Sequence, residues 1–94
     1  EAADAAREQV GLALHEGYIR YLEAYEQLRT QEKSVELARE NYTVILHRYT
    51  NELALVTDML DASNARLEAE TERANARINI IYHYYKLRYL SGTL

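Results

Sequence analysis

Residues 49–53 read YTNEL, and this short stretch separates two long segments that both carry a helical pattern. Thr50 and Asn51 are the only adjacent turn-forming residues in this region. A connection this short forces the segments on either side of it to lie antiparallel as neighbours, as in an αα-hairpin. The stretch therefore predicts a helical hairpin whose tip spans residues 50–54.

The segment before the tip has a row of apolar residues spaced seven apart. This row contains Leu14, Tyr21, Leu28, Val35, Tyr42 and Tyr49. A seven-residue apolar repeat is typical of the packing stripe of a coiled coil, so it predicts a first helix over residues 2–50. Gly11 and Gly17 fall inside this helix without turn-forming neighbours, and we expect them to mark close helix packing.

A second row of the same spacing follows the tip. It contains Leu53, Leu60, Leu67, Ala74 and Ile81. This row predicts a second helix over residues 55–91, which Gly92 would end. Residues 1–94 are therefore expected to form one all-α unit, an antiparallel two-helix coiled-coil hairpin. Opposed residues of such a hairpin have numbers that sum to roughly 104, which gathers seven of the nine tyrosines at its open end.

Two stretches of the second helix have simple structural interpretations. The aromatic run IIYHYYKLRYL, residues 80–90, places its tyrosines at packing positions opposite the first helix, which favours a core role over nucleic-acid binding. The charged run ARLEAETERANAR, residues 65–77, is typical of a solvated helix face with ion pairs four residues apart. Neither stretch predicts a binding site by itself.

Eight further apolar residues lie off the two packing rows. They are Leu12, Ile19, Leu22, Leu37, Val44, Leu55, Ile80 and Leu87. A two-helix hairpin hides only one stripe of each helix, and such a unit is marginally stable alone in water. We therefore expect this hairpin to pack sideways against other helices.

The composition excludes several classes of function. The chain has no cysteine, so it has neither disulfides nor thiolate metal sites. Fifteen acidic residues outnumber eleven basic ones, and because both signs are spread along the chain, nucleic acid is disfavoured as a partner. None of the three histidines has a glutamate three positions before it, and neither an HExxH motif nor a glycine-rich phosphate loop occurs. The sequence thus predicts no catalysis, no metal site and no cofactor.

Asp58 and Asp61 are the candidate functional residues, within LVTDMLDASNARL at residues 55–67. Their spacing puts both on one face of the second helix. The same polar face continues through Ala65, Glu68, Glu72, Asn75 and Asn79. Two interpretations remain open: the acids stabilise the positive end of the helix dipole, or they line an aqueous channel shared with other helices.

Residues 48–94 resemble the last coiled-coil hairpin of the TolC family of outer-membrane efflux proteins. The resemblance is carried by a tyrosine at the turn, a short loop, the motif TDMLDA, an ANAR run, a tyrosine-containing segment and a terminal GTL. The stretch AYEQLRTQEKSVELARENY, residues 24–42, fits the long descending helix of the same repeat. The similarity covers essentially the whole chain. The family usually has glycine where Glu52 stands, and some members carry a basic residue where Ala54 stands.

This resemblance implies a homotrimer in the outer membrane, whose hairpins pack side by side into a hollow α-helical barrel through the periplasm. Contact with the membrane would come only through parts of the protein outside this segment. Asp58 and Asp61 would line the constriction of the channel. The tip would form the gate and the docking site for a periplasmic adaptor protein and an inner-membrane transporter; its residues are Tyr49, Thr50, Asn51, Glu52 and Leu53.

Two alternatives fit the same hairpin. The first is a periplasmic adaptor hairpin, but adaptors carry an Arg-Leu-x-x-x-Asp pattern near the tip, and RLEAET at residues 66–71 ends in Thr71 instead. The second is a coiled-coil scaffold that forms no channel. Strands of alternating polarity before Glu1 would favour the channel, whereas barrel-sandwich strands would favour the adaptor.

Overall fold

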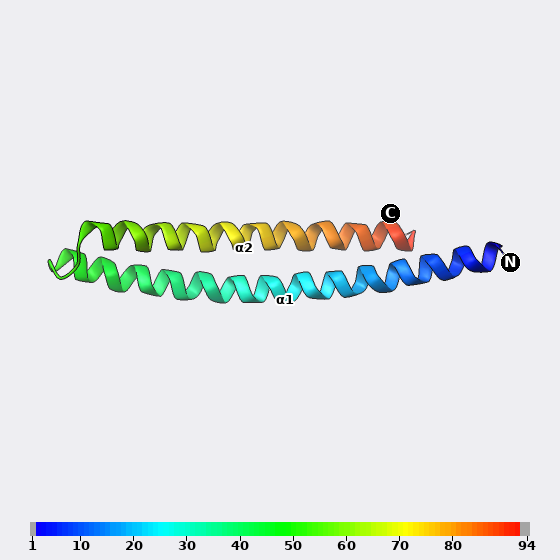
Figure 1. The fold of residues 1–94 in the computed structure, drawn as a ribbon, viewed down its shortest axis with the longest axis horizontal. Coiled ribbons are helices and arrows are strands. Elements are labelled where there is room, and N and C mark those ends of the chain that lie inside the picture. The colour runs from blue at the N-terminus through cyan, green and yellow to red at the C-terminus, as the bar shows by residue number, and fades with distance from the viewer. Residues whose placement is uncertain (1, 93–94) are drawn as a thin grey trace.

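The computed structural model describes residues 2–92 and consists of two long helices (Figure 1). Helix α1 runs from Ala2 to Thr50, and helix α2 runs from Val56 to Ser91. They lie side by side and antiparallel in a rod of 75 × 18 × 16 Å. The predicted all-α, two-helix coiled-coil hairpin is confirmed. Glu1 and the last two residues of the GTL motif, Thr93 and Leu94, lie outside the described residues.

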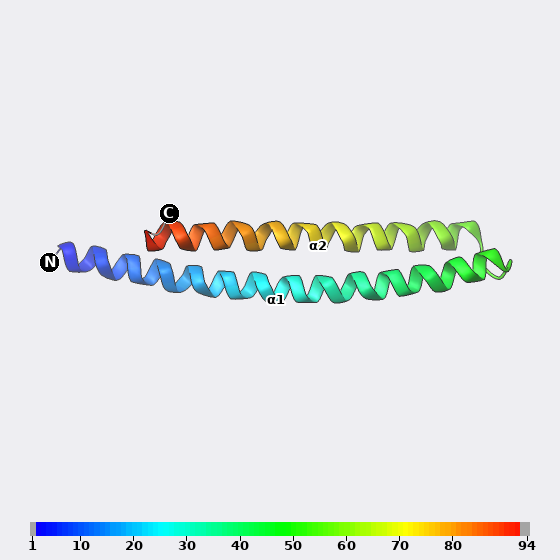
Figure 2. The ribbon, with the colours of Figure 1, turned by 180° about the vertical axis from the view of Figure 1, so that it is seen from behind.

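The start of α1 extends past the end of α2 (Figure 2). Residues 2–10 are all exposed, because they have no part of α2 opposite them. Gly11 lies in this region, and a Cβ added to it would meet nothing within 4 Å. The expectation of close packing at Gly11 is therefore wrong for this chain, since no second helix reaches it.

The seam, the line along which α1 and α2 touch, follows the predicted row on α1. Its positions on α1 are all buried or half-buried, and larger side chains are mostly followed by smaller ones. These positions are Leu14, Gly17, Tyr21, Ala24, Leu28, Gln31, Val35, Ala38, Tyr42 and Ile45. A Cβ added to Gly17 would lie 3.2 Å from Cδ2 of Leu87, so the predicted close packing at Gly17 is confirmed. Tyr49 continues the row in sequence but is exposed, because it lies at the tip.

The predicted packing row of α2 is wrong. Leu53, Leu60, Leu67, Ala74 and Ile81 are all exposed. The seam positions of α2 are instead Met59, Ala62, Arg66, Ala69, Arg73, Ala76, Ile80, His83, Leu87 and Leu90. The alanines of this row, of which Ala62 and Ala76 are buried, let the two helices approach closely beside larger side chains of α1 such as Leu28 and Tyr42. Ile80 and Leu87, expected to need other helices, therefore face α1.

The tip has the hydrogen bonds of a Schellman motif, in which α1 closes on its own last carbonyls. The Leu53 N–H donates to the Arg48 carbonyl at 2.7 Å, and the Glu52 N–H donates to the Tyr49 carbonyl at 3.1 Å. This motif requires a left-handed backbone at Glu52, whose φ is 61°. At the other end, Gly92 stops α2 with φ of 73°, as the sequence predicts.

Candidate functional site

The seam divides the remaining surface of the hairpin into two unlike faces. The polar face is defined by Glu16, Arg20, Glu23, Gln27, Asn41 and Arg48 of α1 and by Asp58, Asp61, Glu68, Glu72, Asn75 and Asn79 of α2, all exposed. The same rows also carry four exposed apolar or aromatic residues, Leu37, Val44, Tyr82 and Tyr89. The apolar face is defined by Tyr18, Leu22, Tyr25 and Leu46 of α1 and by Val56, Leu60, Leu67, Ile81 and Tyr84 of α2, also exposed. Because each residue rotates the helix by about 100°, the two faces flank the seam on opposite sides.

Asp58 and Asp61 lie in a groove on the polar face, close to the tip. The groove has a volume of about 510 Å³ and also contains Asn41, Arg48 and Ala65. The structure therefore brings the two predicted carboxylates together on one exposed surface, with a cationic side chain beside them. Their surroundings are mixed, since Ile45, Leu53 and Ala54 also line the groove, and both carboxylates are open to water.

Asp58 also has a structural role at the start of α2. Its Oδ2 accepts a hydrogen bond of 3.0 Å from the Leu55 N–H, one of the backbone donors that a helix N-terminus leaves without an intrahelical partner. A carboxylate in the first turn also interacts favourably with the positive end of the helix dipole. The helix-terminus interpretation thus holds for Asp58. Because both acids are exposed, the interpretation that they line an aqueous channel also remains open.

The tip residues divide into polar side chains that stabilise the turn and apolar side chains that face solvent. Thr50 Oγ1 donates to the carbonyls of Leu46 and His47 at 3.0 and 2.9 Å, and Asn51 Nδ2 donates to the His47 carbonyl at 2.9 Å. Three apolar side chains of this region are exposed: Tyr49 by 42%, Leu53 by 77% and Leu55 by 69%. The tip therefore offers exposed apolar side chains together with the charged side chain of Glu52, which is also exposed.

The tyrosines gather at the open end, as the sequence predicts, but six of the seven are not core residues. Those six, Tyr18, Tyr25, Tyr82, Tyr84, Tyr85 and Tyr89, are exposed. Tyr21 alone lies in the seam, with ring centroids 5.3 Å from Tyr25 and 6.3 Å from Tyr84. Partial burial raises the pKa of Tyr21 above the usual value for a phenol, and the neighbouring Tyr25 and Tyr84 add to this shift. The core interpretation of residues 80–90 is wrong because their tyrosines mostly face away from the seam.

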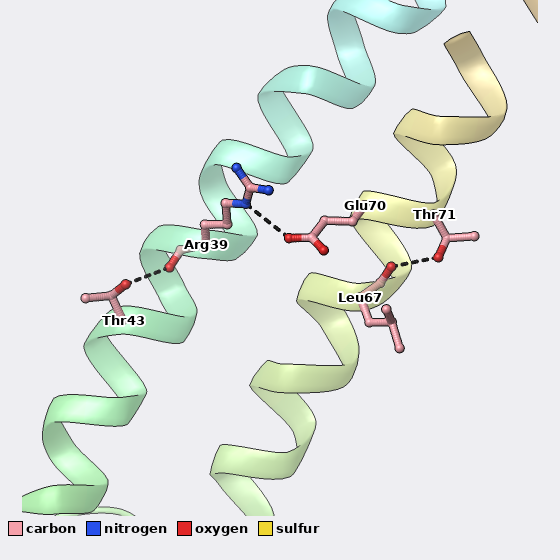
Figure 3. A network of polar contacts seen from close by, with 5 residues as sticks. All are labelled: Arg39, Thr43, Leu67, Glu70 and Thr71. Atoms are coloured by element: carbon pink, nitrogen blue, oxygen red, sulfur yellow. Dashed lines mark hydrogen bonds and ion pairs between the residues drawn. The ribbon is translucent and has the colours of Figure 1, made fainter. Parts of the chain in front are cut away.

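The charged run at residues 65–77 is not an ordinary solvated face. Arg66 and Arg73 are half-buried in the seam, and the guanidinium carbon of Arg66 lies 4.1 Å from the centre of the Tyr42 ring. Glu70 accepts a hydrogen bond of 3.1 Å from Nε of Arg39 across the two helices (Figure 3). The sequence signal for these contacts is that Arg66 and Arg73 share a seven-residue spacing with Met59, Ile80 and Leu87.

Comparison of the chain with protein-family models, with curated proteins and with solved structures finds no match. Within residues 2–92, no three histidine, aspartate or glutamate side chains come together in a way that would hold a metal ion. Neither α1 nor α2, over the same residues, is apolar enough along its length to cross a membrane. The features of the structure that bear on function are therefore the two faces and the tip.

Proposed function

We propose that this hairpin is the periplasmic α-barrel segment of a trimeric, TolC-like outer-membrane channel for efflux or secretion. In such a channel each helix has a neighbour on both sides, and one face of the helix wall lines the aqueous passage. The proposal rests on the sequence resemblance and on how the exposed residues are distributed around α2.

The observation that carries the proposal is a second, largely apolar stripe on α2, interrupted by Asn64 and Thr71. It contains Leu60, Asn64, Leu67, Thr71, Ala74, Ile78, Ile81 and Tyr85, all exposed. Its spacing alternates between four and three residues, which is the spacing of a coiled-coil stripe, and its rotation about the helix axis turns it away from α1. A helix with packing stripes on two opposite sides is suited to a wall of helices, because a lone hairpin uses only one of them.

The polar face supplies the second part of the argument. Three copies of Asp58 and Asp61 around one narrow passage would bring six carboxylates close together and make that passage strongly negative. Such a ring attracts cations and is blocked by multivalent ones. The groove that holds both acids lies next to the tip, where the resemblance implies the constriction.

The tip supports the partner proposal. Tyr49, Leu53 and Leu55 are exposed at the end of the rod, and exposed apolar side chains that cluster are typical of a protein-binding surface. A periplasmic adaptor and an inner-membrane transporter would dock there. Opening would be a change in how the tip helices of the three copies pack, driven by those partners.

The channel proposal is tested by single-channel conductance of the longer protein that contains this segment, in a lipid bilayer. The Asp58→Asn, Asp61→Asn double variant is expected to lose most of its selectivity for cations and to become less sensitive to block by multivalent cations. Both substitutions keep side-chain size, so the passage itself is not widened.

A matched control removes two carboxylates from elsewhere on the hairpin. Glu32 and Glu36 of α1 are exposed and lie across the seam from the polar face, away from the proposed passage. The Glu32→Gln, Glu36→Gln double variant should keep the selectivity of the unmodified channel. Equal effects of the two double variants, or no effect of either, would remove the acidic lining from the proposal.

A further inference from the structure

The apolar face is apolar at both ends and charged in the middle. Its open end carries Tyr18, Leu22, Tyr25, Ile81 and Tyr84, and its tip end carries Leu46, Val56 and Leu60, all exposed. Between these two ends, the same face of α1 and α2 carries three positive and three negative charges. They belong to Arg29, Glu32, Glu36, Arg39, Glu70 and Arg77. We propose that this face binds a second copy of the chain, tip against open end, in an antiparallel four-helix bundle.

Contacts within the hairpin fix which residues lie at the same height along the rod. Tyr21 contacts Tyr84, and a Cβ on Gly17 would contact Leu87, so residues of α1 and α2 at about equal height have numbers that sum to roughly 105. Arg29 therefore lies level with Arg77. In the same way, Glu36 lies level with Glu70.

An antiparallel pair places each helix against its own copy. When two hairpins join face to face with their tips at opposite ends, α1 lies on the second α1 and α2 on the second α2. Full overlap then sets Arg29 against Glu36 of the second copy. On α2 it sets Arg77 against Glu70 of the second copy and Leu67 against Ile81, with Ala74 facing itself at the centre. Charges of opposite sign and apolar side chains therefore meet their complements.

The one pair of like charges in this arrangement is Glu32 with its own copy. Arg29 of each chain lies one helical turn from that pair, within reach of a glutamate of the second copy. Arg39 and Glu70 already form an ion pair within each hairpin, and contacts between the copies would add to that pair. Tyr25 of one chain meets Arg39 of the other, a pair suited to a cation–π contact. The balance of charge in the middle of the face is therefore favourable.

A parallel pair, with both tips at one end, has the opposite electrostatics. It places α1 of each copy on α2 of the other at equal height. Arg29 would then face Arg77, and Glu36 would face Glu70, so like charges would oppose one another in the middle of the interface. Like charges brought together at an interface are unfavourable, and this selects the antiparallel arrangement.

The contact is large enough for a stable dimer. The overlap of residues 13–50 with α2 gives an interface about 57 Å long at 1.5 Å per residue. A strip of that length and about 15 Å wide covers roughly 800 Å² of each copy, which is the usual size for a specific protein–protein interface. The proposal concerns the isolated chain and leaves the polar face free. Leu60, Leu67, Ala74 and Ile81 belong both to this interface and to the stripe that the channel proposal assigns to neighbouring helices, so the two associations exclude each other.

Charge reversal on α1 tests the arrangement of the copies. Sedimentation of the purified chain should give twice the 10.9 kDa of one chain at high concentration, with a measurable dissociation constant. Arg29→Glu and Glu36→Arg should each weaken the dimer on the order of tenfold, because each sets like charges opposite one another twice in the symmetric pair. The double variant should recover the affinity. In a parallel dimer each single variant would instead strengthen association, which would overturn the proposal.

Cysteine cross-linking tests the orientation directly, because the chain has no cysteine of its own. Ala74→Cys should form a disulfide between two copies under mild oxidation, since Ala74 lies at the centre of the antiparallel interface. Asn51→Cys should not, because the two tips lie at opposite ends of the bundle. Circular dichroism of each variant checks that the helices are intact. Three results would each contradict the proposal: cross-linking through Asn51→Cys alone, a trimeric mass, or a monomer at high concentration. The channel proposal is tested separately, by conductance.

Discussion

The guanidinium group of Arg66 lies over the ring of Tyr42 inside the seam, with 4.1 Å between its central carbon and the ring centre. The side chain makes this contact at a position where a coiled coil normally carries an apolar residue. Its Nε is buried and has no hydrogen-bond partner. A favourable cation–π contact thus coexists with an unfavourable buried donor.

Replacing Arg66 by Met should stabilise the hairpin. The cation–π contact contributes about 0.5–2 kcal/mol at a partly buried site, whereas a buried unsatisfied donor costs about 1–3 kcal/mol. Arg66→Met removes both and keeps an unbranched apolar stem in the seam, so the free energy of unfolding should rise by about 1 kcal/mol. Urea denaturation at a fixed protein concentration measures the change. Arg48→Met, at an exposed position of the polar face, is the control and should change the stability by less than about 0.5 kcal/mol. A loss of stability in Arg66→Met would show that the contact with Tyr42 outweighs the buried Nε.

Replacing Glu52 by Gly should also stabilise the hairpin. Glu52 holds a left-handed backbone with φ of 61°, which costs a residue with a Cβ about 1–2 kcal/mol relative to glycine. Part of this gain is lost to the greater freedom of glycine in the unfolded chain, so the net gain should be about 1 kcal/mol. Thermal unfolding measures it. Glu52→Ala removes the same charge but keeps the Cβ, and it should leave the midpoint nearly unchanged; a midpoint raised equally by both variants would assign the effect to charge instead.

The tip and the seam differ in how far the sequence predicts them. The turn follows from local chemistry, because Thr50 and Asn51 hydrogen-bond to carbonyls of the preceding turn and so end α1 where they stand in the sequence. The seam of α2 depends on the opposite helix. Two rows of α2 have the same seven-residue spacing, one containing Leu60 and the other containing Met59. The row of Leu60 is the more apolar, but the row of Met59 is the one that packs against α1.

The same comparison explains why the charged contacts of the seam were not predicted. The sequence alone predicts a solvated position for Arg66, because charged side chains in a helix usually face water. The long side chain of Arg66 packs its stem and guanidinium against Tyr42, a contact that needs the register of the two helices to be known. The candidate acids, in contrast, share a face whatever the register, so the structure brings Asp58 and Asp61 together in one groove.

Tyr21 should make the hairpin lose stability at alkaline pH. Its pKa is raised in the folded state, chiefly by partial burial, so the unfolded chain releases this proton at a lower pH than the folded one. The stabilising effect is complete below the unfolded pKa of about 10 and is lost as pH rises through the folded value. The midpoint of thermal unfolding should therefore fall between pH 8 and about 11, and this fall should be smaller in Tyr21→Phe. Tyr49→Phe, at the exposed tip, is the control, and an equal reduction in both variants would contradict the assignment to Tyr21.

Asp58 and Asp61 should differ in what they contribute to stability, although they lie in the same groove. Asp58 accepts the hydrogen bond from the Leu55 N–H, so Asp58→Ala should lower the free energy of unfolding by about 1 kcal/mol, the usual cost of losing such a contact at a helix N-terminus. Asp61 lies one turn further along α2 at an exposed position, and Asp61→Ala should cost less than about 0.5 kcal/mol. Urea denaturation of both variants gives the comparison, and equal costs would show that the hydrogen bond to Leu55 contributes little. Because Asp61 affects stability less, Asp61→Asn is the cleaner single variant for the conductance measurement, and a loss of cation selectivity there reports on the passage rather than on the fold.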